Sequence, residues 1–193
     1  MSFYRSVRII NKIPPSRMAV LRCHFTLLES HPSLGQSLRK LCYTRLTMKI
    51  YLDTCCLNRP FDDQSQERIR LETEAMMIIL ARLSRKEWTW LGSQTLRIEI
   101  DRAPDVDQQS RLNRVAEFIG RFVEIGQKEL KRAGELEKLG FIGFDAIHLA
   151  CAESGGADVF LSTDDRLLKR AKRFSKKVRV KVMNPLDWLK ETI

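Results

Sequence analysis

The 193-residue sequence lacks several features that would by themselves define its class. It has no run of about 18 apolar residues, so we expect no membrane-spanning segment. Its five cysteines are odd in number and show neither CxxC nor Cys/His spacing, so we expect reduced thiols in a cytoplasmic protein rather than a zinc site. No glycine-rich turn follows the first apolar strand, which disfavours a dinucleotide-binding enzyme.

Acidic residues are scarce in the first 47 positions, and this scarcity explains most of the net charge of +10. That segment holds eight Lys or Arg residues but only one acid, Glu29, a net charge of +7. The rest of the chain has 26 basic and 23 acidic residues, a net charge of only +3. The overall charge is therefore weak evidence for nucleic-acid binding by the folded part of the chain.

The first 47 residues also lack sustained hydrophobic periodicity and contain Pro14, Pro15 and Pro32. We expect 1–47 to be a basic N-terminal extension that is disordered or not native, with Met48 as the real start. Two alternatives stay open, an organellar transit peptide and a flexible basic arm that touches RNA. We expect 48–193 to form the folded domain.

From Met48 onward, strand-like and helix-like patterns alternate. Apolar runs predict strands at 49–53, 88–92, 122–125, 158–162 and 179–183. Apolar residues at spacings of three and four, with capping signals, predict helices at 65–85, 93–101, 105–119, 127–139, 144–155, 164–174 and after Pro185. Such alternation predicts an α/β fold in which helices cover both faces of a mainly parallel sheet of four to five strands.

Four acids occupy positions where such a sheet gathers functional groups. Asp53 ends the first strand and Asp164 follows the fourth, whereas Glu99 and Asp145 lie on helices. In open parallel sheets, sites form beyond the carboxyl ends of the strands. Each acid also lies within an apolar segment, where an unpaired carboxylate is costly. Asp145 alone could simply compensate a helix dipole, so the prediction depends on the set of four.

Four converging carboxylates would repel one another by roughly 4 kcal/mol per close pair at an effective dielectric constant near 20. Divalent cations relieve this repulsion, and hard oxygen ligands select Mg²⁺ or Mn²⁺ over zinc or copper. Such ions activate water for attack on a phosphodiester and stabilise the leaving oxygen. His148, one turn after Asp145, is a tempting further ligand, but we favour a hydrogen-bonded structural histidine.

Four segments of the sequence resemble the acidic motifs of PIN-domain ribonucleases, whose most common small members are VapC-type toxins. The segments are YLDTCCLNRPFDD, the acid in SQTLRIEI, FDAIHLACAE and FLSTDDRLL. The resemblance covers about residues 48–190 and implies a three-layer α/β/α sandwich, dependence on Mg²⁺ or Mn²⁺, and single-stranded RNA as substrate. By position, it implies that the catalytic and metal-binding acids are Asp53, Glu99, Asp145 and Asp164. It implies auxiliary roles for Thr54, Asn58 and Ser162, and Asp165 is the alternative to Asp164.

Two further patterns concern partners. The helix that follows Asp164 carries Arg166, Lys169 and Arg170, which either contact RNA phosphates or form a solvated helix face. The apolar run 76–80 covers more than one helix face, so it either packs in the core, which we slightly favour, or also binds a second copy of the chain or an antitoxin.

The leading hypothesis is a metal-dependent endoribonuclease that cuts single-stranded RNA, acting as the toxin of a type II toxin–antitoxin pair. Its expected partners are a cognate antitoxin and a second copy of itself in a homodimer. The alternative is a PIN-like module that has lost catalysis and binds RNA or protein. A phosphatase with Asp53 as nucleophile is disfavoured, because Cys55 stands where a second acid would be needed.

Overall fold

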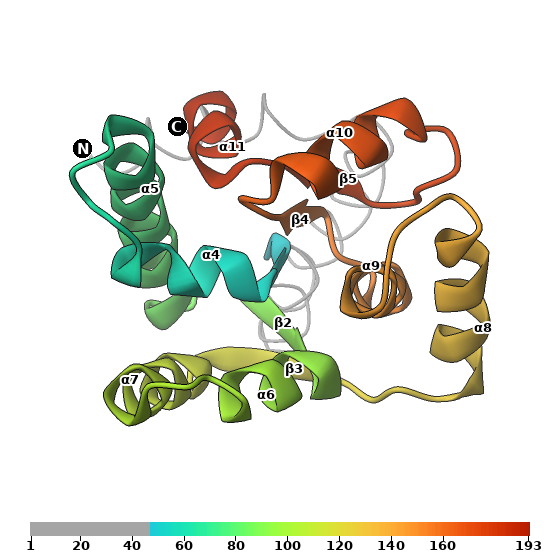
Figure 1. The fold of residues 1–193 in the computed structure, drawn as a ribbon, viewed down its shortest axis with the longest axis horizontal. Helices are drawn as coiled ribbons and strands as arrows, with labels where there is room; N and C mark the ends of the chain where they lie inside the picture. The colour runs from blue at the N-terminus through green and yellow to red at the C-terminus, as the bar shows by residue number, and fades with distance from the viewer. Residues whose placement is uncertain (1–46) are drawn as a thin grey trace, which may run out of the picture. The chain divides into compact units, whose positions relative to one another are not determined.

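A five-stranded parallel sheet organises residues 47–193, the part of the chain that this computed structural model describes (Figure 1). The expectations for residues 1–46 lie outside the described residues. The strands are β1 (Lys49–Leu52), β2 (Thr89–Ser93), β3 (Ile119–Val123), β4 (Val159–Leu161) and β5 (Lys181–Met183). They lie in the order β3-β2-β1-β4-β5, and every pairing is parallel, so the prediction of a mainly parallel sheet is confirmed.

Strand β1 is the centre of the sheet and is buried on both faces. Ile50, Tyr51 and Leu52 have no exposed surface. Because successive side chains of a strand point to opposite faces, Ile50 and Leu52 pack into one hydrophobic core while Tyr51 packs into the other. A continuous apolar run of this kind is typical of a strand covered by helices on both sides.

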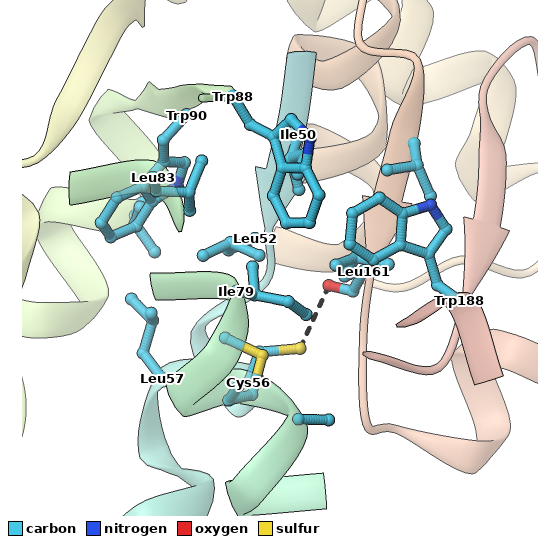
Figure 2. Packing of buried hydrophobic residues seen from close by; sticks show 14 of the residues in the cluster. Ile50, Leu52, Cys56, Leu57, Ile79, Leu83, Trp88, Trp90, Leu161 and Trp188 are labelled. Atoms are coloured by element: carbon cyan, nitrogen blue, oxygen red, sulfur yellow. Dashed lines mark hydrogen bonds between the residues drawn. The ribbon is translucent and has the colours of Figure 1, made fainter. Parts of the chain in front are cut away.

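One face of the sheet is covered by a large aromatic and aliphatic core. The helices that pack there are α4 (Thr54–Asn58), α5 (Glu67–Ser84), α6 (Gln94–Asp101), α7 (Val106–Ala116) and α11 (Pro185–Thr192). The Trp88 and Trp188 rings meet edge to face with their centres 5.0 Å apart, and the Cys56 thiol donates to the Leu161 carbonyl over 3.3 Å (Figure 2). Trp90 lies in the same core, so both tryptophans of the second strand region serve packing.

The opposite face is covered by α8 (Gln127–Glu137), α9 (Phe144–Gly155) and α10 (Asp165–Arg173). Here the Tyr51 ring stacks on Phe160, with ring centres 5.4 Å apart and an angle of 10° between the planes. In Figure 1, α8 and α9 lie together on the side of the sheet opposite α5. Two helical layers around one sheet confirm the predicted α/β/α sandwich.

The third strand and the helix before it differ from the prediction. The helix ends at Ala116, and β3 begins at Ile119, three residues earlier than expected. Ile119 pairs with Trp90, and its side chain lies over Gly92. A Cβ added to Gly92 would come within 2.6 Å of the Ile119 Cδ1. Contact with β2, which no local pattern encodes, therefore draws Ile119 into the sheet. The 3-10 helix η2 (Arg59–Phe61) and α4 before it were also not predicted.

The apolar run on α5 has both of the predicted environments. Met76 and Ile79 are buried in the core, whereas Met77 and Ile78 are 58% and 44% exposed. With Leu80 partly buried against the same core, core packing explains three of the five residues of the run and leaves Met77 and Ile78 exposed. No helix among residues 47–193 has the length and apolar character needed to cross a membrane.

Glu72, in the middle of α5, is a buried acid that two arginines and an asparagine approach. It is only 1% exposed, and its carboxylate lies 2.9 Å from the Arg59 Nε and 2.9 Å from the Arg68 Nε. Asn184, which caps α11, donates to it over 2.7 Å. One carboxylate thus ties α5 to η2 and to the start of the last helix.

We expect Glu72→Ala to destabilise the protein by about 3 kcal/mol, because a broken buried ion pair leaves an uncompensated charge. The matched control is Glu74→Ala on the same helix, where a carboxylate 57% exposed pairs with Arg70 and should contribute under about 0.5 kcal/mol. Urea unfolding of both variants measures the difference. Equal losses would show that Glu72 is no more than a surface ion pair.

Candidate active site

The carboxyl end of β1 brings Asp53 to the centre of the sheet edge. The Asp53 N–H donates to the Leu161 carbonyl over 3.0 Å, which extends the pairing of β1 with β4 by one residue. The side chain is only 6% exposed. Sites of parallel α/β sheets form at this edge, as predicted from the sequence.

The Asp53 carboxylate is held by a hydroxyl and a thiol. Its Oδ2 accepts from the Ser162 hydroxyl at 2.7 Å and from the Cys55 thiol at 3.1 Å. Ser162 is itself fixed by the Asp164 N–H at 3.1 Å. Within residues 47–193, no Lys or Arg forms an ion pair with Asp53, and burial raises the pKa of this carboxyl well above its usual value. A desolvated carboxylate without a cation is a candidate metal ligand.

Glu99 lies on α6 with its side chain 25% exposed. Its Oε2 accepts a hydrogen bond from the Thr54 hydroxyl and lies 2.5 Å from the His148 Nε2. Burial alone would raise the pKa of Glu99, but the hydrogen bonds from His148 and Thr54 outweigh it, so the pKa lies below its usual value. Glu99 is therefore held as an ionised carboxylate.

Asp145 lies in the first turn of α9 and experiences the charge of every other acid in the predicted set. The helix starts after Gly143, whose φ of 56° is a conformation that favours glycine. Burial raises the pKa of Asp145 to about 6, together with the charges of Asp53, Asp164 and Glu99 in decreasing order. The structure thus brings the other three predicted acids close enough to Asp145 for their charges to raise its pKa.

The fourth acid position distinguishes Asp164 from its neighbour. The Asp164 Oδ1 caps α10 by accepting from the Arg166 N–H at 2.7 Å and the Leu167 N–H at 3.4 Å. Asp165 instead binds both terminal nitrogens of Arg68, at 2.6 and 2.7 Å. Asp165 is thus paired with Arg68 of α5, whereas the charge of Asp164 raises the pKa of Asp145. This difference supports Asp164 as the fourth acid.

The acids do not form a ready-made metal cage. No three His, Cys, Asp or Glu side chains of the described chain surround one point in a metal-holding arrangement. Instead, Asp53 turns to Ser162, Glu99 to His148 and Asp164 to the α10 backbone. The donor set still fits a hard divalent cation, because it offers oxygen ligands whose mutual repulsion a cation would relieve.

The other predicted site residues separate into two groups. Thr54 and Ser162 each donate to one of the four acids. Asn58 accepts a hydrogen bond from Gln108 on α7 over 3.0 Å, and no hydrogen bond joins it to the four acids within residues 47–193. Of the basic residues, Arg166 is 90% exposed, while Arg170 donates to the Gly140 carbonyl of the loop before α9.

Three contributions were missed by reasoning from the sequence. Cys55 bonds Asp53, and Tyr51 bonds the Nδ1 of His148 at 2.7 Å. Arg102 follows Glu99 at a spacing of one helical turn. Its positive charge lowers the pKa of the Glu99 carboxyl further, by less than the hydrogen bonds do. The spacing of Arg102 was a usable signal, whereas the contacts of Tyr51 and Cys55 depend on residues far away in the sequence.

The family model of the PIN domain matches residues 50–173, a span that includes all four acids. The chain therefore belongs to the PIN domain family. PIN domains are generally nucleases, and PIN nucleases typically use divalent metal ions.

Two solved structures with a similar chain path come from bacterial complexes. FitAcB from Neisseria gonorrhoeae aligns with a TM-score of 0.46 and 16% identity over 70% of this chain and 97% of that chain. VapBC2 from Rickettsia felis, bound to a DNA fragment from its promoter, aligns with a TM-score of 0.45 and 15% identity over 71% of this chain and 98% of that chain. The comparison with curated proteins found no match. The family assignment rests on the PIN domain match.

We expect Asp145→Asn to stabilise the protein at pH 7 in the presence of EDTA. The folded-state pKa of Asp145 is raised, so the unfolded chain releases this proton first and stability falls as the pH rises from about 4 to about 6. Discounted for partial exposure, the gain should be about 1 kcal/mol, or 2–4 °C in Tm. It should vanish at pH 4, and Asp165→Asn, which loses its Arg68 partner, should give no gain. A stability gain of Asp145→Asn that persists unchanged at pH 4 would show that it does not come from the raised pKa of Asp145.

Proposed function

We propose that this chain is a divalent-metal-dependent endoribonuclease that cuts single-stranded RNA in the cytoplasm. The observation that carries the proposal is the placement of Asp53 and Asp164 after adjacent parallel strands, with Glu99 and Asp145 near enough that the charges of the other three acids add to burial in raising the pKa of Asp145. A site that has lost catalysis has no physical need to keep carboxylates that repel one another. The alternative, a catalytically inactive PIN-like module that binds RNA or protein, is disfavoured for that reason.

The four acids would hold Mg²⁺ or Mn²⁺, with Asp53 and Asp164 as the ligands at the two strand ends. When bound, such an ion lowers the pKa of a coordinated water and neutralises charge that develops on the phosphate. Ser162 fixes Asp53, and Thr54 fixes Glu99, so two of the carboxylates keep a defined direction. Asp145, with its raised pKa, is suited to orient the attacking water.

The RNA backbone would lie along α10, which begins beside Asp164. Arg166 and Lys169 are exposed on this helix and would contact phosphates, which is binding without base selection. Arg170 would contribute less, since its guanidinium also holds the Gly140 carbonyl. Arg102 beside Glu99 would add a further positive charge near the scissile phosphate.

We further propose that the protein is the toxin of a type II toxin–antitoxin pair and forms a homodimer. The exposed Met77 and Ile78 on α5 offer an apolar surface that a cognate antitoxin or a second copy would cover. A small adjacent reading frame for a DNA-binding antitoxin would favour the toxin role. The absence of an inhibitory partner gene would favour another nuclease role.

Asp53→Asn should reduce Mn²⁺-dependent cleavage of single-stranded RNA at least about 100-fold, because the central carboxylate loses its charge. The amide has the same shape, so circular dichroism and Tm should show an intact fold. Asp165→Asn is the matched control, since that acid pairs with Arg68 outside the site, and it should keep cleavage within about two-fold of the parent chain. A parental rate in Asp53→Asn would refute the mechanism.

A chain that starts at Met48 should fold and keep its cleavage activity, because 48–193 contains the sheet, its two hydrophobic cores and all four acids. We therefore propose 48–193 as the nuclease unit and 1–47 as a dispensable extension. Thermal melting and RNA cleavage of the shortened chain measure this. Loss of either property would make residues 1–47 an integral part of the protein.

A further inference from the structure

A series of short hydrogen bonds runs through the interior to Glu99. The Tyr51 hydroxyl lies 2.5 Å from the Ser93 Oγ and 2.7 Å from the His148 Nδ1. The His148 Nε2 lies 2.5 Å from the Glu99 Oε2. Ser93 and Tyr51 have no exposed surface, and His148 is 1% exposed. Residues of β1, β2, α6 and α9 thus form one buried relay that ends on a carboxylate of the candidate site.

The chemistry of the groups sets the direction of donation. An ionised carboxylate only accepts, so the His148 Nε2 carries a proton. When the imidazole carries this one proton, Nδ1 accepts and the Tyr51 hydroxyl donates to it. The phenol oxygen in turn accepts from Ser93, whose oxygen accepts from the Leu96 N–H at 3.4 Å. Every donor of the relay therefore points toward Glu99.

We propose that Tyr51 and His148 are positioning residues that fix Glu99 for metal binding. Both hydrogen bonds to Glu99 from the described residues, from His148 and Thr54, end on Oε2, so Oε1 is the oxygen left for a cation. Both ring nitrogens of His148 are engaged, so it serves the site through Glu99 and not as a ligand. This inference rests on the proposed function, because it gives Glu99 a metal to bind.

The Tyr51 hydroxyl is the selective element of the relay. With the hydroxyl in place, the imidazole carries its proton on Nε2, facing Glu99. Without the Tyr51 hydroxyl, nothing selects that tautomer. In the other tautomer the proton is on Nδ1, and two acceptors, the His148 Nε2 and the Glu99 Oε2, face each other. A purely structural network would lose stability on the same change but would not lose metal affinity in particular.

The test is Tyr51→Phe in the full chain, because Phe keeps the stacking on Phe160 and removes only the hydroxyl. Mn²⁺ binding without RNA is measured by isothermal titration calorimetry, beside Tm in EDTA. We expect the Mn²⁺ Kd to rise about 10- to 100-fold, and cleavage to recover as Mn²⁺ is raised. The matched control is Thr95→Val on α6, which removes a buried hydroxyl that has no hydrogen-bond partner among residues 47–193 and should leave the Kd unchanged.

Ser93→Ala provides a second variant, one step further from Glu99, should Tyr51→Phe fail to fold. It should raise the Mn²⁺ Kd in the same direction by a smaller factor. A parental Kd in a folded Tyr51→Phe or Ser93→Ala chain overturns the relay while cleavage by the parent chain upholds the proposed function. A parent chain that neither binds Mn²⁺ nor cuts RNA overturns both.

Discussion

Electrostatic repulsion among carboxylates at the carboxyl edge of the sheet is the constraint on which the candidate site depends. β1 is buried on both faces, so the residue that ends it, Asp53, leaves water without meeting a positive side chain of the described chain. Parallel topology brings the ends of β1 and β4 together, and α6 and α9 add their acids at the same edge. The fold therefore concentrates negative charge where a cation can relieve it.

Another buried acid, Glu72, differs from Asp53 because it has positively charged partners. Glu72 is 1% exposed and Asp53 6% exposed, yet Arg59 and Arg68 both lie 2.9 Å from the Glu72 carboxylate. Asp165, next to the site, is likewise paired with Arg68. Among residues 47–193, arginines thus pair with Glu72 and Asp165, whereas none forms an ion pair with Asp53 or Asp145. Uneven pairing of this kind, rather than the number of acids, distinguishes a functional cluster from a structural one.

Two carboxylates of the site, Asp53 and Glu99, each accept their side-chain hydrogen bonds through one oxygen. Ser162 and Cys55 hold Oδ2 of Asp53, while Thr54 and His148 hold Oε2 of Glu99. Such contacts fix the direction of a carboxylate and leave its second oxygen for another partner. Tyr51 belongs both to the hydrophobic core and to the hydrogen-bonded relay, because its ring packs on Phe160 while its hydroxyl contacts His148. Core packing and site geometry are therefore coupled through a single residue of the central strand.

The sequence by itself determined the alternation of strands and helices, the four acids and their place after strands, because periodicity and strand-end position are local properties. It could not determine the start of β3, since Ile119 joins the sheet through contact with Gly92. Nor could it separate Asp164 from Asp165, whose difference depends on Arg68, 97 residues away. Only the tertiary structure decided which acids are paired and which repel, because pairing depends on distances between segments that the order of residues does not specify.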